Sequence, residues 1–454
     1  MEKLVVIGGG GAGMFSAIVA GQLKPGKYET TIVSDEKEIY CRCTSPYIIT
    51  KEAKLEEAIQ PDSMITDYGV KLIHEKVIRI DHFQKIVLTN RSRKIPYDKL
   101  VIATGSRPSL PPIKGLHSPK VMTVRTAKDI RKIQSFVKKG THVVVIGGGI
   151  IGVEMAGALD KQGVKTSIVE FQHQLLSGIA DTEYTLKLHD LLEINKIKIY
   201  LESIAEEIKN GKKGSKKVII KDRKTGKRKE LEAEFIIIAT GIKPNTEFLE
   251  SCDMKLDKRG FIVVDDRMRT NVKDVYACGD CVSSKHAVTG EITPGPLASI
   301  AIQQSKIVGF NLAGFPIRYH GHTNACAFKT FNTEYAEVGL SEELARKKYK
   351  FVVTGKALTT HHYKDMKDTK PLEVKLIFGG WKMRLLGAQA YGHGTETPIE
   401  IASFAISQKL SILKLLRYNY ASHPSLTPWP FMNPIIMATE EALGKIMSWF
   451  KKRT

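Results

Sequence analysis

Two glycine-rich turns have the residue spacing needed to bind the phosphates of dinucleotides. The first turn spans residues 8–13, follows the apolar run of residues 4–7 and opens a helical pattern over residues 14–23. In such a turn the glycines permit a tight bend, close approach of a pyrophosphate and packing of helix on strand, and the helix N-terminus supplies N–H donors. The predicted binding residues are Gly8, Gly10, Gly11, Ala12 and Gly13.

An acidic pair follows the next strand-like run, which ends at Val33. A carboxylate about twenty residues beyond such a turn binds a ribose hydroxyl. Asp35 and Glu36 both stand near that distance, and the sequence leaves open which of them is used.

The same pattern recurs at residues 147–152, after the apolar run 143–146. Here the acid is Glu170, at the end of the run 166–169. A carboxylate binds a 2′-hydroxyl and repels a 2′-phosphate, so NADH is favoured as the ligand, and NADPH remains possible because His173 and many lysines are near. The predicted binding residues are Gly147, Gly149, Ile150, Ile151, Gly152 and Glu170.

Each turn is followed by a buried strand that runs into a Thr-Gly pair, at residues 100–108 and 236–241, and a Gly-Asp pair stands at 279–280. With these motifs in this order, nearly the whole chain resembles the pyridine nucleotide-disulfide oxidoreductases. The resemblance implies that the first turn holds FAD and the second NAD(P)H. It adds as FAD residues Arg42, Ala103, Thr104, Gly105, Arg107, Gly279 and Asp280, the last on the ribityl chain, and as NAD(P)H residues Thr240 and Gly241.

The implied fold class is α/β, with two Rossmann-like dinucleotide-binding domains and an α+β C-terminal dimerisation domain. The length of 454 residues agrees with two or three domains. We expect a discontinuous FAD-binding domain, an NAD(P)H-binding domain inserted in it, and a dimerisation domain that begins with two strands and a charged helix near residues 341–348. The boundaries are 1–114 with 242–320, 115–241, and 321–454.

Cys43 is the candidate redox centre, because the family places its reactive cysteine just past the second strand of the FAD domain. No C-x-x-x-x-C pair is present, and Cys43 followed by Pro46-Tyr47 resembles the single-cysteine branch, which contains coenzyme A-disulfide reductases, NADH oxidases and peroxidases, and persulfide reductases. The Tyr40-x-Arg42 step is also similar to rubredoxin-reductase-like and nitrite-reductase-like flavoproteins.

One thiolate is sufficient for the chemistry that this branch performs. We expect Arg42 and a helix N-terminus to lower the pKa of Cys43, whose thiolate can attack a disulfide, a sulfane sulfur or a peroxide. The alternative is a small buried side chain with no reactive role. The role of Cys41 stays open between a strained C-x-C disulfide and a packed thiol.

The other cysteines and the adjacent histidines do not predict a metal site. Cys278 and Cys281 lie within the flavin-binding Gly-Asp motif and are interpreted as structural, and Cys252 and Cys326 as packing residues. We expect His361 and His362 to point apart on a strand, so no four-ligand set is completed and no metal is predicted.

Three further residues take catalytic roles from the resemblance. His423, in a His-Pro-Ser segment similar to the family's His-Pro-Thr, would cross a homodimer interface and protonate the thiolate that leaves when Cys43 attacks. Tyr420 is a second candidate donor, and Glu154 would lie where the nicotinamide meets the flavin. A capping or structural histidine is the alternative for His423.

Two departures from the family pattern bear on the substrate. Oxidases and peroxidases of this branch often carry a histidine in the first glycine turn, where this chain has Gly11, so oxygen or peroxide turnover is disfavoured. Coenzyme A-disulfide reductases typically have arginines late in the first helix, where residues 18–22 contain none. Coenzyme A is therefore left open as the substrate.

The net charge is strongly positive, because 69 lysines and arginines exceed 48 aspartates and glutamates. The basic residues are spread along the chain without a nucleic-acid-binding motif, so we expect no nucleic-acid partner, and the densest run, residues 212–229, reads as a solvated hairpin. An acidic electron-carrier protein is a possible partner.

No apolar stretch reaches membrane-spanning length and no signal peptide is evident, so the prediction is a cytoplasmic protein with no integral membrane segment. The amphipathic tail at residues 440–452 is interpreted as packing on the dimer partner rather than on a membrane.

The sequence therefore predicts an FAD-dependent NAD(P)H oxidoreductase that reduces a small disulfide, persulfide or polysulfide through Cys43 and works as a homodimer. The alternatives are an NADH oxidase or peroxidase, and a reductase of an electron carrier such as rubredoxin or ferredoxin. The sequence does not identify the electron acceptor.

Overall fold

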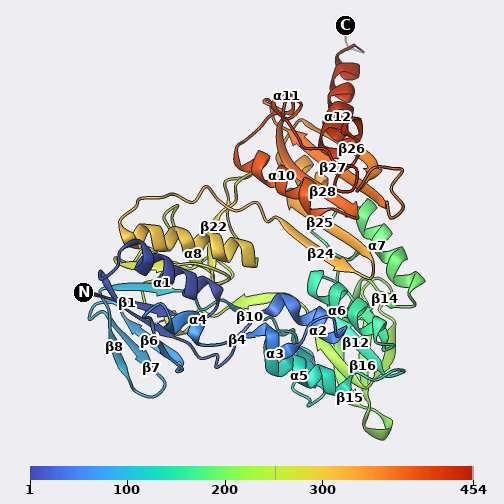
Figure 1. Ribbon diagram of the computed structural model, residues 1–454. Coiled ribbons are helices and arrows are strands. Elements are labelled where there is room, and N and C mark those ends of the chain that lie inside the picture. The colour runs from blue at the N-terminus through green and yellow to red at the C-terminus, as the bar shows by residue number, and fades with distance from the viewer. Residues whose placement is uncertain (251, 452–454) are drawn as a thin grey trace. The chain divides into compact units, whose positions relative to one another are not determined.

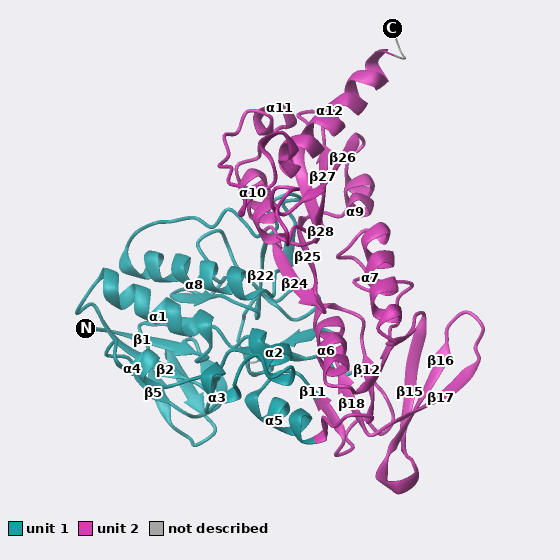
Figure 2. Cartoon of the chain, turned by 45° about the vertical axis from the view of Figure 1, so that its right-hand side comes forward, with its two compact units in different colours: residues 1–110, 123–135, 241–322 teal, residues 111–122, 136–240, 323–454 magenta. Residues whose placement is uncertain are grey.

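The computed structural model describes residues 1–250 and 252–451, which form two compact units (Figure 2). Unit 1 contains residues 1–110, 123–135 and 241–322. Unit 2 contains residues 111–122, 136–240 and 323–454. Each unit therefore gathers segments that are far apart in the sequence.

A five-stranded sheet forms the centre of unit 1, with the strand order β21-β9-β1-β2-β5 and every pairing parallel. Its strands are nearly continuous apolar runs, typical of a sheet covered on both faces. The register places the end of β1, Ile7, beside Val33 and Ile102, so the carboxyl ends of three strands meet at one edge. The strands are β1 (Glu2–Ile7), β2 (Tyr28–Val33), β5 (Lys71–Ile73), β9 (Lys99–Ile102) and β21 (Val275–Ala277).

Two helices of unit 1 lie side by side, α1 (Gly11–Leu23) and α8 (Ala298–Ala313) (Figure 1). A Cβ on Gly309 of α8 would lie 2.7 Å from Val19, so the absence of a side chain allows the close approach. Unit 1 also contains β3 (Ile39–Tyr40), β4 (Ile59–Gln60), β6 (Val77–Asp81), β7 (Ile86–Thr89), β8 (Lys94–Pro96), β10 (Ser106–Pro108), β19 (Ile242–Pro244), β20 (Ile262–Val263), β22 (Val282–Lys285), β23 (Ile292–Pro294), α2 (Ser45–Ile49), α3 (Leu55–Ala58), α4 (Ser63–Thr66), most of α5 (Ala127–Phe136), and the 3₁₀ turns η1 (Arg42–Thr44) and η3 (Glu247–Leu249).

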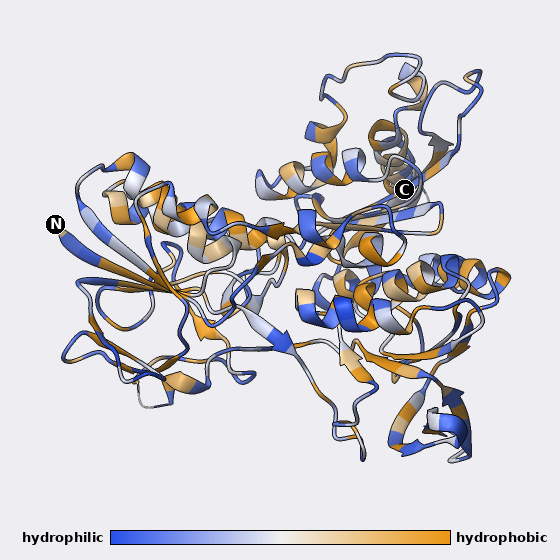
Figure 3. Cartoon of the chain, turned by 60° about the horizontal axis from the view of Figure 1, so that its bottom comes forward, coloured by the Kyte–Doolittle hydropathy of each residue, from blue (hydrophilic) through white to orange (hydrophobic). Residues whose placement is uncertain are grey.

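A second five-stranded sheet, with the order β11-β18-β12-β13-β14, repeats this design in unit 2. Ile146 at the end of the central strand lies beside Val169 and Ile238 in parallel register. Hydrophobic residues concentrate in the strands of both parallel sheets (Figure 3). The elements are β11 (Val121–Thr123), β12 (His142–Ile146), α6 (Ile150–Lys161), β13 (Lys165–Val169), α7 (Thr182–Ile194), β14 (Lys198–Tyr200) and β18 (Phe235–Ile238).

The lysine-rich run 212–229 contains the predicted hairpin. The hairpin joins β16 (Lys216–Asp222) to β17 (Arg228–Ala233), and β16 also pairs with β15 (Ser203–Asn210), all antiparallel. The expectation that this run is solvated is wrong for one face of β16, where Lys216, Val218 and Ile220 are buried. A short 3₁₀ turn, η2 (Lys212–Gly214), links β15 to β16.

The C-terminal part of unit 2 is an antiparallel sheet with the order β24-β25-β28-β27-β26. Two strands followed by a charged helix, α9, open this part, as predicted. Helix α12 packs on β26 so closely that a Cβ on Gly355 would lie 1.7 Å from the carbonyl oxygen of Ala438. The elements are β24 (Cys326–Thr330), β25 (Thr333–Gly339), α9 (Glu342–Lys348), β26 (Val352–Thr360), β27 (Pro371–Gly379), β28 (Arg384–Gly392), α10 (Glu396–Ser407), α11 (Ile412–Leu415), η4 (Pro430–Met432) and α12 (Pro434–Lys451). None of the helices formed by the described residues combines the length and apolar character that crossing a membrane requires.

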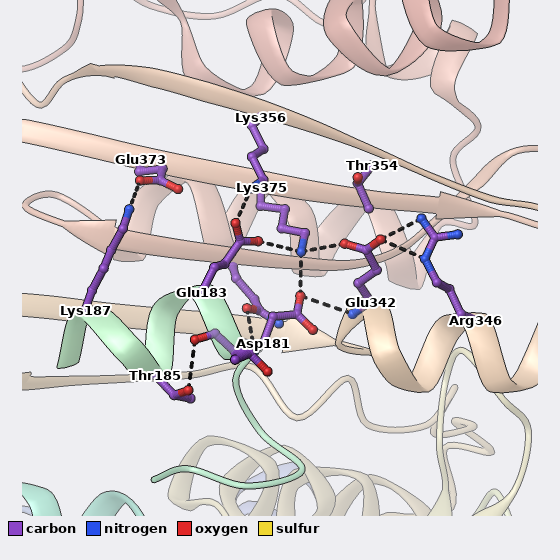
Figure 4. A network of polar contacts seen from close by, with 12 residues as sticks. Asp181, Glu183, Thr185, Lys187, Glu342, Arg346, Thr354, Lys356, Glu373 and Lys375 are labelled. Carbon is purple, nitrogen blue, oxygen red and sulfur yellow. Dashed lines mark hydrogen bonds and ion pairs between the residues drawn. The ribbon is translucent and has the colours of Figure 1, made fainter. Parts of the chain in front are cut away.

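A buried lysine ties three segments of unit 2 together (Figure 4). The side chain of Lys375, on β27, is 3% exposed, and its Nζ lies 2.8 Å from Asp181 Oδ2 and 2.7 Å from oxygens of both Glu183 and Glu342. Burial alone would raise the pKa of Glu183, but hydrogen bonds from Lys356 and Lys375 outweigh it and lower that pKa. The ammonium therefore holds the start of α7 and the start of α9 against the C-terminal sheet.

Replacing Lys375 with methionine is expected to lower the free energy of unfolding by about 3–5 kcal/mol, because it leaves buried carboxylates without their cation. Urea unfolding measures this loss. The control is Lys347→Met, which removes an exposed ion pair with Glu343 worth about 0.5 kcal/mol. Because the pKa values of Glu183 and Glu342 are lowered, the stabilisation should be present at neutral pH and be lost as the pH falls through those values. Equal effects of the two substitutions would contradict this role.

Candidate active site

The first glycine turn is built by close backbone approaches. Gly8 has φ +113°, and a Cβ there would lie 2.2 Å from the carbonyl oxygen of Ala103. A Cβ on Gly13 would lie 1.9 Å from the carbonyl oxygen of Gly8, so strand, turn and helix pack without side chains between them. Gly10, the N-cap of α1, carries no side-chain cap and has open space at its Cβ position. Uncapped N–H groups beside open space fit the pyrophosphate of a dinucleotide.

The second turn repeats this geometry in unit 2. Gly147 has φ +113°, and its Cβ would lie 2.3 Å from the carbonyl oxygen of Ala239, while a Cβ on Gly152 would lie 2.0 Å from that of Gly147. Gly149 is the uncapped N-cap of α6 and has open space at its Cβ position. The pair Thr240-Gly241 follows β18, and Gly241 has φ +95°. This turn fits a second dinucleotide for the same physical reasons.

The position after the second strand differs between the two turns. In unit 2 it is Glu170, whose carboxylate accepts the backbone N–H groups of Gly148 and Gln172. In unit 1 it is Ser34. A Cβ on Gly9 would lie 2.9 Å from Ser34 Oγ, and a Cβ on Gly148 would lie 3.0 Å from Glu170 Oε2, so the two residues occupy equivalent positions. The search for a carboxylate singled out Asp35 and Glu36 and passed over Ser34, which occupies the equivalent position but carries a hydroxyl.

Of the two acids that the sequence left open, Glu36 is engaged by Arg42. Nη2 of Arg42 lies 2.6 and 2.7 Å from the two carboxylate oxygens of Glu36, and Asp35 is exposed. Nε of Arg42 donates to the carbonyl oxygen of Arg125 at 3.2 Å. Because the charge of Arg42 is balanced by Glu36, its effect on the Cys43 thiol is weaker than the sequence alone suggested.

Cys43 lies in the 3₁₀ turn η1, immediately before α2, and its side chain is exposed. The turn is fixed at both ends: Thr44 donates through its N–H and its hydroxyl to the carbonyl oxygen of Cys41, and Ser45 Oγ donates to that of Arg42 at 2.7 Å. Cys41 is also exposed, and no disulfide joins it to Cys43. Neither reading of Cys41 holds in this structure, because it forms no disulfide and its exposed side chain is not packed, while Cys43 is exposed on a turn fixed by hydrogen bonds.

Arg125 is a functional candidate that the sequence analysis missed. Its side chain is 17% exposed, and its Nη1 lies 3.8 Å from Asp280 Oδ2. A Cβ on Gly105 would lie 3.3 Å from its Nη2. Burial and repulsion from Arg42 lower the pKa of Arg125, so the neighbouring carboxylates balance its positive charge only in part. That shortage favours an anionic ligand beside Asp280. No motif marks position 125 in the sequence.

The Gly-Asp pair at 279–280 reaches the first turn. A Cβ on Gly279, which has φ +82°, would lie 2.9 Å from the Ala12 side chain, and its N–H donates to Gln304 Oε1 at 2.9 Å. Asp280 Oδ2 lies 3.2 Å from Ser106 Oγ. Unit 1 thus brings the first turn, the Thr-Gly turn after β9 and Asp280 together.

Thr104 and Arg107, which were also predicted to bind FAD, contact a different segment of unit 1, residues 245–247. Thr104 Oγ1 donates to the carbonyl oxygen of Asn245 at 2.7 Å, and the guanidinium of Arg107 pairs with Glu247. Arg107 is therefore hydrogen-bonded directly to a carboxylate, whereas Arg125 lies 3.8 Å from Asp280.

The structure tests the interpretation of Cys278 and Cys281 as structural residues and the expectation that His361 and His362 point apart. Cys278 and Cys281 are fully buried, and burial raises the pKa of both thiols, as expected for packing residues. The expectation for His361 and His362 is wrong: they follow the end of β26, where the pleat no longer separates them, and their rings stack with centroids 3.8 Å apart.

Glu154 lies on α6, two residues beyond the second turn, and burial raises the pKa of its carboxyl to about 7, against a hydrogen bond from the Lys329 backbone that lowers it. A carboxyl with this pKa changes charge near neutrality.

His423 and Tyr420 lie in the loop after α11. Nδ1 of His423 accepts the N–H of Ser425 at 3.3 Å, so the neutral ring carries its proton on Nε2. The hydroxyl of Tyr420 donates to the carbonyl oxygen of Pro430 at 2.8 Å. Among the described residues, neither side chain hydrogen-bonds to another predicted site residue.

Comparison with known proteins agrees with this geometry. Residues 2–304 match the family described as pyridine nucleotide-disulphide oxidoreductase, and residues 326–430 match its dimerisation domain. The chain is 30% identical over 410 residues to a Pyrococcus horikoshii protein named NAD(P)H coenzyme A polysulfide/persulfide reductase, covering 88% of this chain and 90% of that protein. It is 29% identical over 456 residues to a Methanocaldococcus jannaschii protein named NADH oxidase, covering 98% and 99%.

A solved structure of an NAD-dependent persulfide reductase from A. fulgidus has the same fold, with a TM-score of 0.91 and 27% identity. The match covers 98% of this chain and 84% of that one. The family resemblance and the α/β fold class predicted from the sequence are both confirmed.

Because Glu154 has a pKa of about 7, dinucleotide binding at the second turn should depend on pH. Glu154 is expected beside the nicotinamide, which is cationic in NAD⁺, so the ionised carboxylate should attract it and affinity for NAD⁺ should rise several-fold as the pH rises through about 7. The Glu154→Gln substitution should remove this dependence, whereas Glu193→Gln, which changes an exposed carboxylate on α7, should retain it. Calorimetric titration with NAD⁺ at several pH values measures the effect. A wild-type affinity that stays constant across that range would refute this role of Glu154.

Proposed function

This chain belongs to the pyridine nucleotide-disulphide oxidoreductase family and is an FAD-dependent NAD(P)H oxidoreductase, and we propose that it reduces a small disulfide, persulfide or polysulfide at Cys43. The observation that carries the proposal is the exposed thiol of Cys43 on a fixed turn whose neighbour, Arg42, contacts Arg125. Arg125 in turn lies beside Asp280. The names of the relatives from P. horikoshii and A. fulgidus, both persulfide reductases, support this substrate class.

We assign FAD to the first turn, because the group that reduces Cys43 must lie near it and both belong to unit 1. Gly8, Gly10 and Gly13 would hold the pyrophosphate, Asp280 the ribityl chain, and Arg125 an anionic part of the cofactor. When bound, FAD accepts a hydride from NADH and supplies a pair of electrons to sulfur.

We assign NAD(P)H to the second turn. Gly147, Gly149 and Gly152 would hold its pyrophosphate, and Glu170 would accept a ribose hydroxyl. A carboxylate at this position favours NADH, since it repels the 2′-phosphate of NADPH. Glu154, at the start of the same helix, would face the reacting end of the nucleotide.

In the proposed reaction the Cys43 thiolate attacks a disulfide, so one S–S bond breaks, a mixed disulfide with Cys43 forms, and a thiolate leaves. His423, in its imidazolium form, would give its Nε2 proton to the leaving thiolate and become the neutral ring. Two electrons from NADH then cleave the mixed disulfide and restore the Cys43 thiolate. The sum is one disulfide, NADH and a proton converted to two thiols and NAD⁺.

We further propose that the active assembly is a homodimer. The match to a dimerisation domain spans the loop that contains His423 and Tyr420. In the proposed assembly each subunit would supply these two residues to the Cys43 turn of its partner. The domain division at residues 1–114 with 242–320, 115–241 and 321–454 accompanies this proposal.

An NADH oxidase is the second candidate, because the M. jannaschii relative carries that name. Gly11, in place of a histidine in the first turn, disfavours it, since no acid–base group then stands in that turn. Reduction of an acidic electron carrier draws on the positive net charge and on the Tyr40-x-Arg42 step.

Substituting Cys43 with serine is expected to lower NADH-dependent disulfide or persulfide reduction by at least about a thousandfold, because serine does not attack disulfides. Slow oxygen-dependent NADH oxidation should persist, since it needs no thiolate. Cys41→Ser is the matched control, two residues away and equally exposed, and should retain most of the reductase activity. Thiol release and oxygen consumption are measured separately. Full reductase activity in Cys43→Ser would sink the proposal.

Replacing the last glycine of either turn with a larger residue should abolish ligand binding at that turn and leave binding at the other turn intact. Gly13→Val places side-chain atoms against the Gly8 carbonyl and should yield protein that does not retain FAD. Gly152→Val should yield protein that retains FAD and has lost NADH affinity by at least about a hundredfold, through the equivalent clash with Gly147. Flavin absorbance of the purified protein and NADH titration distinguish them. Loss of FAD from the Gly152→Val protein alone would reverse the assignment.

A further inference from the structure

A pocket of about 500 Å³ lies in unit 2, away from the residues of both glycine turns. One wall is the loop of residues 113–119, and the other is formed by the end of β15 and the start of β16. Its volume falls in the range of small-ligand pockets. None of its lining residues has a part in the proposed reaction.

The two walls are joined by backbone contacts, so the pocket is formed before any ligand arrives. Lys114 N–H donates to the carbonyl oxygen of Glu206 at 3.1 Å, and Ile208 N–H donates to that of Lys114 at 2.7 Å. Gly115, with φ +82°, allows this approach, because a Cβ there would lie 2.2 Å from the carbonyl oxygen of Ile208.

Lys216 is the unusual residue of this pocket. It is 7% exposed and lies on the same face of β16 as Val218 and Ile220, both buried in the apolar core. Its Nζ donates to Asn210 Oδ1 at 2.7 Å, and no carboxylate among the described residues pairs with it. An ammonium has three donors, so a buried cation is left here with one neutral acceptor and no counter-charge.

The other polar groups of the pocket are also donors. Ser118 Oγ is buried and has no hydrogen-bond partner among the described residues. Lys209 and His117 stand at the opening. The nearby carboxylate, Glu207, is shared between Lys114 at 3.3 Å and Lys209 at 3.1 Å, so it does not neutralise Lys216. The floor is apolar, with Ile113, Leu116 and Ile208 buried. In Figure 3 the hairpin next to this region carries hydrophilic residues beside its apolar ones.

We propose that this pocket binds a phosphate ester with a small apolar body, the phosphate on Lys216 and Ser118 and the body on the apolar floor. Ammonium and hydroxyl donors together match the several acceptor oxygens of a phosphate, and a phosphate supplies the counter-charge that Lys216 lacks. Inorganic phosphate shares this chemistry, and the apolar floor favours the ester.

Calorimetric titration of the FAD-loaded enzyme, with NAD⁺ at saturation to occupy the second turn, tests the proposal with phenyl phosphate as the probe. Saturable binding of one ligand per chain is expected. Lys216→Met should weaken it by about tenfold or more, since methionine keeps the packing and removes the charge. The matched control is Lys217→Met, which changes the next residue on the opposite face of β16 and should alter affinity by less than about twofold.

Ser118→Ala provides a second variant and should weaken binding several-fold without a change in charge. Inorganic phosphate should bind more weakly than phenyl phosphate; equal affinity would remove the apolar body from the proposal and identify a free-phosphate site. Benzoate that binds as tightly as phenyl phosphate would overturn the preference for phosphate. Absence of saturable binding to the wild type, or equal losses in Lys216→Met and Lys217→Met, would overturn the site itself.

Discussion

The structure depends on close contacts between backbone atoms at positions where a side chain would not fit. In each parallel sheet, the first glycine of a turn lies against the carbonyl of the strand that runs beside it, at Ala103 and at Ala239, and the last glycine lies against the first. These contacts fix the helix N-terminus over the carboxyl edge of the sheet, with its N–H groups uncapped. A dinucleotide is the ligand that this arrangement fits, because its pyrophosphate accepts several N–H donors at once. The same construction in both units provides for two such ligands.

The cations discussed above differ in how completely neighbouring carboxylates balance their charge, and we assign a different role to each degree of balance. Lys375 is enclosed by three carboxylates, and this balanced network stabilises unit 2. Around the first turn, Arg42 is balanced by Glu36, while Arg125 has Asp280 at 3.8 Å and a weaker interaction with Glu36, which do not offset its burial and the repulsion from Arg42. Lys216 has no carboxylate at all among the described residues. Incomplete compensation of a buried cation is unfavourable in the free protein, and it is the physical basis for assigning anionic ligands beside Arg125 and Lys216.

What could be predicted from the sequence was local. The glycine turns, Glu170 and the lysine-rich hairpin each depend on residues close together in the chain, so their spacing reports their structure. Ser34 was missed because the sequence argument looked for a carboxylate, and the residue equivalent to Glu170 in the first turn carries a hydroxyl instead. Arg125 could not be found, since its environment is made by residues 42, 105 and 280, which only the fold brings together. His361 and His362 were misplaced because β26 ends at Thr360, so neither lies in the strand whose alternation would separate them.

The central claim is that the sulfur of Cys43 exchanges electrons directly with the flavin held by the first turn. Anaerobic titration of the FAD-loaded protein with NADH, followed by absorbance, tests it most directly. The account predicts a long-wavelength band from a thiolate in contact with the flavin, present in the wild type and in Cys41→Ser and absent from Cys43→Ser. A wild-type protein that bleaches with NADH and never develops this band would contradict it.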